Sequence, residues 1–290
     1  MAKIIDGKKI AAEINESVKK RIKEISAAVG RVPKLASLTL GSPKDAEIYV
    51  NMQKRTAEKV GIDFEDIRLE ADLSQEDLIR EIEKLNKDIF VTAIIVQKPV
   101  PENIDHDRII AAIDPRKDAE GLHPYNLGKI LRHEADLVAC TPGAVMKILS
   151  AEKIDLYGKE VVIVGGSAVV GKPLSLLMLN EMATTTVCNI ATSEKGYLSE
   201  HVGRADVLVV AVGCPEMIKG EWVSEGAVVI DVGINMVEDK IVGDVAFSEV
   251  EKKASVITPV PGGVGPVTVS ILMRNVFRAH KAQHLSSTGL

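Results

Sequence analysis

The sequence predicts an α/β protein of two domains whose strands form parallel sheets. Short runs rich in β-branched residues alternate with amphipathic helical stretches, a pattern typical of parallel sheets with crossover helices. The run 90–97 is almost wholly apolar, as expected of a strand that is covered on both faces. The length of 290 residues corresponds to two domains of roughly 150 residues each.

The first half of the chain alternates regularly between expected strands and expected helices. We expect strands at 35–40, 63–69 and 90–97, a helix at 44–60 that ends at Gly61, and a helix that Ser74 caps. Glu76 and Asp77 suit the first turn of that second helix, where negative charge meets the positive end of the helix dipole. The segment 99–128 is rich in Pro, Asp and Gly and has one short helix at about 105–112, so we expect the first domain to end within it.

The alternation resumes in the second half. The expected elements are a helix at about 142–152, strands at 161–164, 185–190, 207–212, 228–231 and 256–258, and a final helix at about 266–282.

Composition excludes several classes of function. Lys and Arg number 36 against 41 Asp and Glu, and a net charge of −5 argues against a nucleic-acid partner. There is no apolar run of the roughly 18 residues that a membrane helix needs, and the first residues lack the apolar core of a signal peptide. Cys140, Cys188 and Cys214 are far apart and have no metal-ligand spacing. We expect a cytoplasmic protein with no membrane partner and no metal site.

The run 161–179 carries the first chemical motif. A buried strand leads into Gly165, Gly166 and Ser167, and Gly171 follows immediately before a helix. Such glycines let the backbone approach a pyrophosphate, and the start of the helix offers free N–H groups. The motif therefore predicts a dinucleotide site on a doubly wound sheet, with a tight turn that binds no ligand as the alternative.

The end of the next expected strand bears on the choice of dinucleotide. NAD enzymes often place an acidic residue there and NADP enzymes a basic one, but this strand ends at Ile190 with neither. The absence of a basic residue favours NAD weakly, because another loop could supply the charge.

Other motifs follow the later strands. The loops 231–235, 242–245 and 258–266 lie at strand ends. The last has three Pro and three Gly in nine residues and predicts either a preformed wall of a ligand site or a rigid connector. In the first half, Tyr49 and Gln53 share one helix face, and Gln97 ends a buried strand. The charged run 117–120 is by itself typical of a solvated loop.

Nine segments together resemble the methylenetetrahydrofolate dehydrogenase/methenyltetrahydrofolate cyclohydrolase family, over essentially the whole chain to about residue 282. In chain order they read IIDGKKIA, IYV, VQKPVP, KDAEGLHPYNLGKI, CTPGAVMKIL, GGSAVVGKP, DVGIN, VGDV and ITPVPGGVGPVTV. The resemblance implies a folate domain over 1–120, against which a C-terminal helix at about 266–282 packs, and a Rossmann-type NAD(P) domain over 121–265. It also implies a homodimer joined through the cofactor domains.

The resemblance further implies the reaction and its residues. Members oxidise 5,10-methylenetetrahydrofolate by hydride transfer to NAD or NADP, and bifunctional members then hydrolyse the methenyl product to 10-formyltetrahydrofolate. The catalytic residues implied are Tyr49, Gln53, Gln97 and Glu120. Substrate binding is assigned to Tyr49, Lys98, Pro99, Pro261, Gly262 and Gly263, and cofactor binding to Gly165, Gly166, Ser167, Gly171, Ile190, Ile234 and Thr258.

The departures from the family pattern bear on the second reaction. Gln53 stands where the family has its catalytic lysine, Glu120 replaces an aspartate, and Ala46 and Lys98 also differ. Because Gln cannot transfer a proton at neutral pH, we expect a dehydrogenase with weak or absent cyclohydrolase activity. The alternatives are a bifunctional enzyme that uses Lys98 or water around Gln53 and Glu120, a non-catalytic folate- or nucleotide-binding relative, and a reductase for another substrate.

Overall fold

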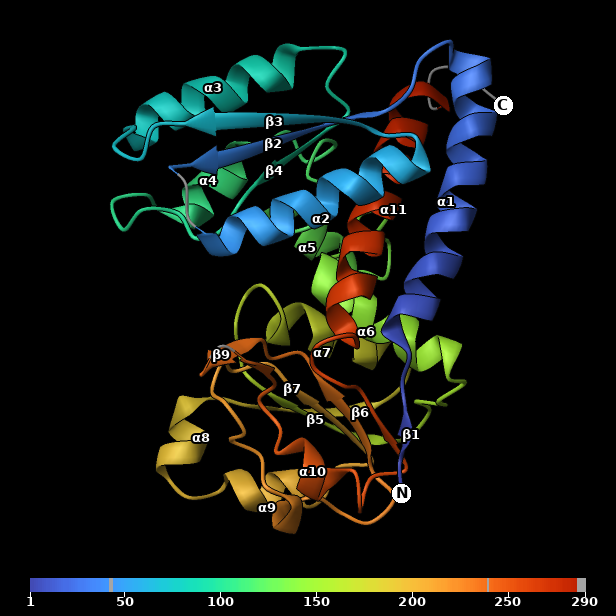
Figure 1. Cartoon of the computed structure of the whole chain (residues 1–290), viewed down its shortest axis with the longest axis vertical. Coiled ribbons are helices and arrows are strands. Elements are labelled where there is room, and N and C mark those ends of the chain that lie inside the picture. The colour runs from blue at the N-terminus through green and yellow to red at the C-terminus, as the bar shows by residue number, and fades with distance from the viewer. Residues whose placement is uncertain (42–43, 239, 286–290) are drawn as a thin grey trace. The chain divides into compact units, whose positions relative to one another are not determined.

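Two parallel sheets organise the chain, and each belongs to a separate unit (Figure 1). The computed structural model describes residues 1–41, 44–238 and 240–285. Unit 1 contains residues 1–11 and 139–268, and unit 2 contains residues 12–138 and the chain from 269 onward. This division differs from the expected domain ranges 1–120 and 121–265, because the first residues belong with the second half and residues 121–138 with the first.

Unit 2 is built on a three-stranded parallel sheet in the order β3-β2-β4. The strands are β2 (Lys34–Leu40), β3 (Asp63–Leu69) and β4 (Ala93–Val96), and the helices are α2 (Lys44–Val60), α3 (Gln75–Lys87), α4 (His106–Ala112) and α5 (Pro124–Leu131). The central strand β2 is buried from Leu35 to Leu40. Figure 1 shows α3 on one side of the sheet and α2 on the other, which accounts for the apolar character of both faces.

Local signals predicted most of these elements well. The expected helix 44–60 and strand 63–69 are confirmed, and the Ser74 side chain accepts a hydrogen bond from the Asp77 backbone N–H at 3.1 Å. The expected strand 90–97 is too long, since β4 begins only at Ala93. Phe90 is 63% exposed and lies in a turn, where its backbone N–H donates to the Asp88 carboxylate. Apolar character alone did not distinguish this surface turn from a buried strand.

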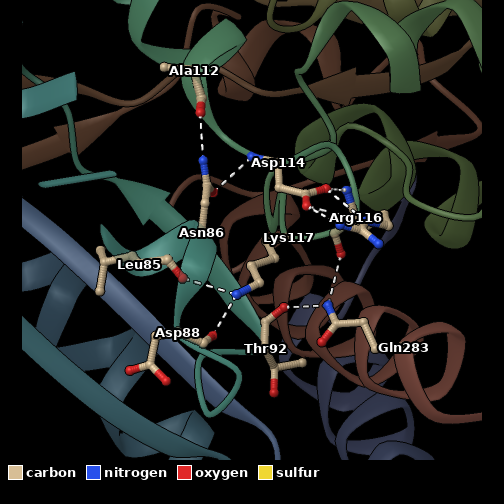
Figure 2. Close-up of polar contacts among 9 residues, drawn as sticks. All are labelled: Leu85, Asn86, Asp88, Thr92, Ala112, Asp114, Arg116, Lys117 and Gln283. Atoms are coloured by element: carbon tan, nitrogen blue, oxygen red, sulfur yellow. Dashed lines mark hydrogen bonds and ion pairs between the residues drawn. The ribbon is translucent and has the colours of Figure 1, made fainter. Parts of the chain in front are cut away.

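The C-terminal end of α3 is closed by a buried lysine from a distant loop (Figure 2). Lys117 is only 7% exposed, and its ammonium donates to the backbone carbonyls of Leu85 at 2.9 Å and Asp88 at 2.7 Å. The last carbonyls of a helix have no partner within the helix, and a cation suits the negative end of its dipole. Lys117 is therefore a structural cap, and the expectation of a solvated loop at this position is wrong.

Two side-chain amides complete the same junction. The Asn86 amide donates to the Ala112 carbonyl and accepts from the Asp114 backbone N–H, so it joins α3 to the end of α4. Gln283 donates to the carbonyls of Thr92 and Arg116 (Figure 2). Gln283 lies on α11 (Val264–Leu285), so these bonds attach the C-terminal helix to the loops before β4 and before Lys117.

Unit 1 contains a six-stranded parallel sheet in the order β1-β11-β8-β7-β5-β6, together with an antiparallel hairpin of β9 and β10. The strands are β1 (Lys3–Ile4), β5 (Glu160–Val164), β6 (Thr184–Cys188), β7 (Val207–Val210), β8 (Val228–Asp231), β9 (Asn235–Val237), β10 (Lys240–Val242) and β11 (Val256–Ile257). The helices are α6 (Cys140–Ala151), α7 (Gly171–Asn180), α8 (Ile190–Glu194), α9 (Leu198–Val202), α10 (Phe247–Val250) and the 3₁₀ turn η1 (Gly220–Trp222).

The order of strands confirms the two-domain α/β fold with a Rossmann-type sheet. From β5 the chain moves outward to β6 and then returns to β7 on the other side of β5. In doubly wound sheets, ligands bind at the carboxyl ends of the strands where the order reverses in this way. The fold therefore marks the loops after β5 and β7 as the place for a dinucleotide.

Several elements were not expected from the sequence. The helix α1 (Gly7–Val29) buries Ile10, Ile14 and Val18, whose spacing of four residues was an available signal. The strand β1 pairs with β11, with Lys3 opposite Val256. None of the helices in the described ranges is long and apolar enough to cross a membrane.

Replacement of Lys117 by Met tests the role of this residue as a cap. The variant keeps the aliphatic chain but leaves two buried carbonyls without their donor, so we expect the free energy of unfolding to fall by about 1–3 kcal/mol. Urea unfolding measures the change. Lys87→Met is the matched control, because Lys87 lies in the last turn of the same helix but is exposed. An equal loss in both variants would contradict the assignment.

Candidate functional site

The loop after β5 is shaped by two glycines that other backbone atoms approach closely. Gly165 has φ +119°, and a Cβ added there would lie 2.2 Å from the Ala211 carbonyl oxygen. A Cβ at Gly171 would lie 1.8 Å from the Gly165 carbonyl oxygen. The loop thus folds tightly over the β5 and β7 strand ends and leads into α7, which suits close approach of a pyrophosphate to the backbone.

Other expected cofactor residues lie in or beside this loop. The Ser167 hydroxyl accepts a hydrogen bond from the Val170 backbone N–H at 3.1 Å and so closes the turn before α7. A Cβ at Gly166 would lie 3.6 Å from the Asn189 Cβ, so this part of the loop faces the end of β6. The structure therefore brings Gly165, Gly166, Ser167 and Gly171 together at one strand end.

The end of β6 differs from the expected strand 185–190. The strand stops at Cys188, and Asn189 caps α8 by accepting hydrogen bonds from the Ala191 and Thr192 backbone N–H groups. Ile190 is the first residue of that helix and is 73% exposed. Asn189 thus occupies donors that could otherwise serve an anion, and no basic side chain is present from 189 to 191.

Two buried aspartates hold the loops after β7 and β8. The Asp244 carboxylate accepts from the backbone N–H groups of Val212, Gly213 and Cys214 at 2.7–3.0 Å. It also accepts from the side-chain amide of Asn235. The Asp231 carboxylate accepts from the N–H groups of residues 233, 244 and 245, each at 3.0 Å. Burial nevertheless raises the pKa of Asp231 to about 6.

Glycines in the loops 231–235 and 242–245 make room for the two aspartates. A Cβ at Gly233 would lie 2.2 Å from the Asp244 carboxylate, and a Cβ at Gly243 would lie 1.8 Å from Asp231 Oδ2. Each motif therefore supplies the space that the carboxylate of the other needs. The neighbouring Ile234 is 51% exposed. The contacts of Asp231 and Asp244 thus fix the shape of both loops.

The proline- and glycine-rich loop follows β11. The Thr258 hydroxyl is buried and accepts a hydrogen bond from the Asp231 backbone N–H at 2.7 Å. The Gly263 N–H donates to the Pro259 carbonyl, and Gly262 between Pro261 and Gly263 has φ +107°. The turn is packed against the start of α1, since a Cβ at Gly7 would lie 1.9 Å from the Gly263 carbonyl oxygen. The loop is thus a fixed surface beside the β8 strand end.

In unit 2, a buried pair of glutamines lies where β4 meets α2. The Gln97 amide donates to Gln53 Oε1 at 2.7 Å and to Ser37 Oγ at 3.0 Å, and Gln53 donates back to Gln97 Oε1 at 3.3 Å. Gln53 and Gln97 are each 5% exposed, and Ser37 is fully buried. The two glutamines are thus in direct contact with each other. Ser37 was missed, although a polar residue within an apolar strand was an available signal.

The segment 117–121 runs beside β4 and brings Glu120 to the same sheet edge. Asp118 forms a parallel bridge with Ile94, which sets Glu120 near the end of β4. The Asp118 carboxylate is 1% exposed and accepts from the N–H groups of Gly121 and His123 and from the Asn126 amide, at 2.8–2.9 Å. These bonds fix the turn that presents Glu120.

Glu120 differs from the other buried acids because one of its oxygens lacks a donor. Its Oε2 atom is buried and has no hydrogen-bond partner among the described residues. Burial and, to a smaller extent, the charge of Asp118 raise the pKa of Glu120 to about 7, and the ammonium of Lys98 opposes this rise. A carboxyl group that titrates near neutral pH can both accept and donate a proton.

The other residues expected near this sheet edge differ in how far they are buried. Tyr49 is partly buried on α2, and burial raises its pKa. Lys98 and Pro99 are exposed directly after β4. The charge of Lys98 also acts on His106, since burial and then the Lys98 ammonium lower the pKa of this histidine. The side chain of Ala46 lies outside the described part of the structure.

Two family models match the chain. Residues 5–120 match the model described as "Tetrahydrofolate dehydrogenase/cyclohydrolase, catalytic domain". Residues 139–284 match the model described as "Tetrahydrofolate dehydrogenase/cyclohydrolase, NAD(P)-binding domain". The two matches together cover most of the chain.

Similar proteins carry related names. The chain is 45% identical over 282 residues to "Bifunctional protein FolD" of Geotalea uraniireducens, covering 97% of this chain and 99% of that protein. The solved structure of bifunctional FolD methylenetetrahydrofolate dehydrogenase/cyclohydrolase from Campylobacter jejuni has a TM-score of 0.94 and 40% identity, covering 98% and 100% of the two chains. FolD from Trypanosoma brucei, solved with NADP and an inhibitor, has a TM-score of 0.93 and 37% identity over 97% and 98%.

Replacement of Gly243 by Ala tests the interlocking of the two aspartate motifs. The new methyl group would overlap the Asp231 carboxylate, so we expect a loss of about 1–3 kcal/mol in the free energy of unfolding. The control is Gly128→Ala in α5, where an added Cβ meets nothing within 4 Å. Alanine there should leave stability unchanged or raise it by up to about 1 kcal/mol. Thermal unfolding of both variants checks the contrast, and equal melting temperatures would refute it.

Proposed function

The chain belongs to the tetrahydrofolate dehydrogenase/cyclohydrolase family, and we propose that it carries out both reactions of a bifunctional member. It would oxidise 5,10-methylenetetrahydrofolate with NAD(P) and hydrolyse the methenyl product to 10-formyltetrahydrofolate. The expectation of a weak or absent cyclohydrolase finds no support in the relatives, which are named as bifunctional. The observation that carries the proposal is Glu120, a buried carboxyl with a pKa of about 7 near Lys98.

Unit 1 is proposed as the dinucleotide domain. The tight loop of Gly165, Gly166, Ser167 and Gly171 fits a pyrophosphate, since any Cβ at Gly165 or Gly171 would fill the space that the backbone uses. Ile190, Ile234 and Thr258 would complete the site at the neighbouring strand ends. When bound, the nicotinamide accepts a hydride from the substrate. The contribution of the chain is to hold rigid loops at the strand ends, and Asp231 and Asp244 serve that purpose.

Unit 2 is proposed as the folate domain. Tyr49, Gln53, Gln97 and Glu120 would contact the substrate, with Lys98 and Pro99 beside them. The family resemblance also assigns substrate binding to Pro261, Gly262 and Gly263, which belong to unit 1. The buried amide pair offers fixed hydrogen-bond groups and no charge, which suits a substrate that gains positive character as it loses a hydride. The polar edge of pterin is the natural partner of such groups.

Hydrolysis of the methenyl compound requires movement of a proton. Water adds to the bridging carbon and loses a proton, and the nitrogen that leaves this carbon gains one. Glu120 is suited to the first role because its ionised form is well populated at neutral pH and one oxygen is free of internal donors. The Lys98 ammonium would stabilise the ionised form of Glu120 during this step, since no lysine is present at position 53.

A dehydrogenase without hydrolase activity is the second candidate, and one observation favours it. Gln53 is bonded to Gln97 in both directions and cannot supply the proton that a lysine would. The two candidates differ in one measurable respect, the rate at which the methenyl compound is hydrolysed.

The proposal predicts two linked activities, of which only one depends on Glu120. With methylenetetrahydrofolate and NAD, purified protein should reduce the nicotinamide and hydrolyse the methenyl compound well above the buffer rate. Glu120→Gln should lower hydrolysis by about 10²–10⁴-fold and hydride transfer much less. Wild-type hydrolysis should rise with pH through about 7, as Glu120 ionises, and this rise should disappear in the variant.

The matched control for this experiment is Glu102→Gln, which removes an exposed carboxylate a few residues after β4. It should retain both activities. Hydrolysis at the buffer rate in wild type would establish the dehydrogenase alone. Reduction of neither dinucleotide would point to a non-catalytic relative or to another substrate.

We propose NAD as the preferred dinucleotide. The support is the exposed Ile190 at the start of α8 and the use of the nearby N–H groups by Asn189. Ile190→Arg should shift the ratio of kcat/KM values toward NADP by about tenfold or more, because a cation there can meet the extra phosphate. Ile241→Arg, an exposed position on β10, is the control and should leave the ratio unchanged. Higher kcat/KM with NADP in wild type would contradict the preference.

We propose a homodimer joined through β6. This strand is the outermost strand of its sheet, and Val187, Leu179 and Met182 nearby are 37%, 50% and 65% exposed. Light scattering at micromolar concentration should give about twice the chain mass of 31.2 kDa. Val187→Lys should shift the mass toward the monomer, whereas Val237→Lys on the hairpin should not. A monomeric wild type would overturn the proposal.

A further inference from the structure

Unit 2 contains a pocket that has no part in the proposed folate or dinucleotide sites. Its volume is about 530 Å³, within the range of pockets that hold small organic ligands. The wall comes from α1, from the loop before α6 and from α11. The lining residues are Arg21, Ala135, Asp136, Phe277, Arg278, Lys281 and Ala282. None of them belongs to the motifs that identify the family.

The charges around this pocket are unbalanced. Arg21, Arg278 and Lys281 provide three cations, and none of them forms an ion pair within the described ranges. Asp136 is the single acid in the lining, and its carboxylate lies 3.6 Å from Lys129 Nζ. Arg278 is held in place by a hydrogen bond from Nη1 to the backbone carbonyl of Asp136, at 2.6 Å. Three positive charges therefore face the space against the single carboxylate of Asp136, which also lies near Lys129.

The pocket also places like charges close to each other. Burial lowers the pKa of Arg278 most, the Asp136 carboxylate opposes this shift, and the positive charge of Arg21 adds to it. Such an arrangement costs free energy in the empty pocket, and an anion that meets both guanidinium groups would recover it. Phe277, at 4% exposed, together with Ala135 and Ala282 provides an apolar surface for the body of a ligand.

We propose that this pocket binds a small organic anion that carries at least two phosphate or carboxylate groups. Planar guanidinium groups bind both of these oxyanions in a bidentate manner, and Lys281 adds a third positive charge. The volume leaves room for a carbon framework against Phe277 in addition to the charged groups. The proposal is independent of the chemistry assigned to Glu120 and of the glycine-rich loop.

Calorimetric titration of the full chain, with NAD present to fill the proposed dinucleotide site, tests the proposal with two probes, pyrophosphate for phosphates and citrate for carboxylates. We expect one saturable site in wild type, and the tighter probe identifies the class of oxyanion. The double variant Arg21→Gln/Lys281→Gln should weaken binding by at least about tenfold, because two charge-assisted contacts are lost. Both residues are exposed, so the variant keeps the Arg278 bond to Asp136.

Lys20→Gln is the control for the loss of a nearby positive charge outside the pocket. Lys20 is exposed on α1 next to Arg21 but does not line the pocket. Binding within about twofold of wild type in this control, together with the loss in the double variant, supports the pocket. Three results would overturn it: no saturable binding of either probe, equal binding by the double variant, or equal weakening by Lys20→Gln.

Discussion

Where the chain leaves a parallel sheet, its backbone N–H groups need new hydrogen-bond acceptors. In this protein, buried carboxylates are those acceptors. Asp244 accepts from three consecutive N–H groups after β7, and Asp231 accepts from the loops after β8 and β10. Asp118 does the same for the turn beside β4. An unpaired buried N–H group is costly, so these carboxylates determine which loop shapes the sheet edges can hold.

Glu120 stands apart from these acids because its turn is fixed by another residue. Asp118 takes up the donors of the turn, and the Glu120 Oε2 atom remains buried without a donor. Burial is the main cause of a raised pKa for both Glu120 and Asp231, but Asp231 is opposed by three backbone donors. In unit 2, the sheet edge beside β4 thus holds Asp118, whose carboxylate fixes a turn, and Glu120, whose Oε2 atom has no donor among the described residues.

Gln53 changes the electrostatics of this edge. A lysine at that position would place an ammonium beside Gln97, whereas the amide forms a neutral reciprocal pair with Gln97. The positive charge that acts on Glu120 then comes from Lys98. Lys98 is exposed whereas Gln53 is buried, so this charge lies at the rim of the sheet edge. On the proposed function, this arrangement would let Glu120 move a proton without a lysine at position 53.

The sequence by itself determined the features that depend on neighbouring residues. Apolar spacing and end signals sufficed for α2, for β3 and for the Ser74 cap, and glycine spacing sufficed for the loop after β5. Tertiary structure decided the rest. Lys117 is buried because the end of α3 lies within its reach, and β1 is a strand because β11 is there to pair with it. A run of two residues has no periodicity of its own, and a charged side chain shows its burial only when the carbonyls that it satisfies are in place.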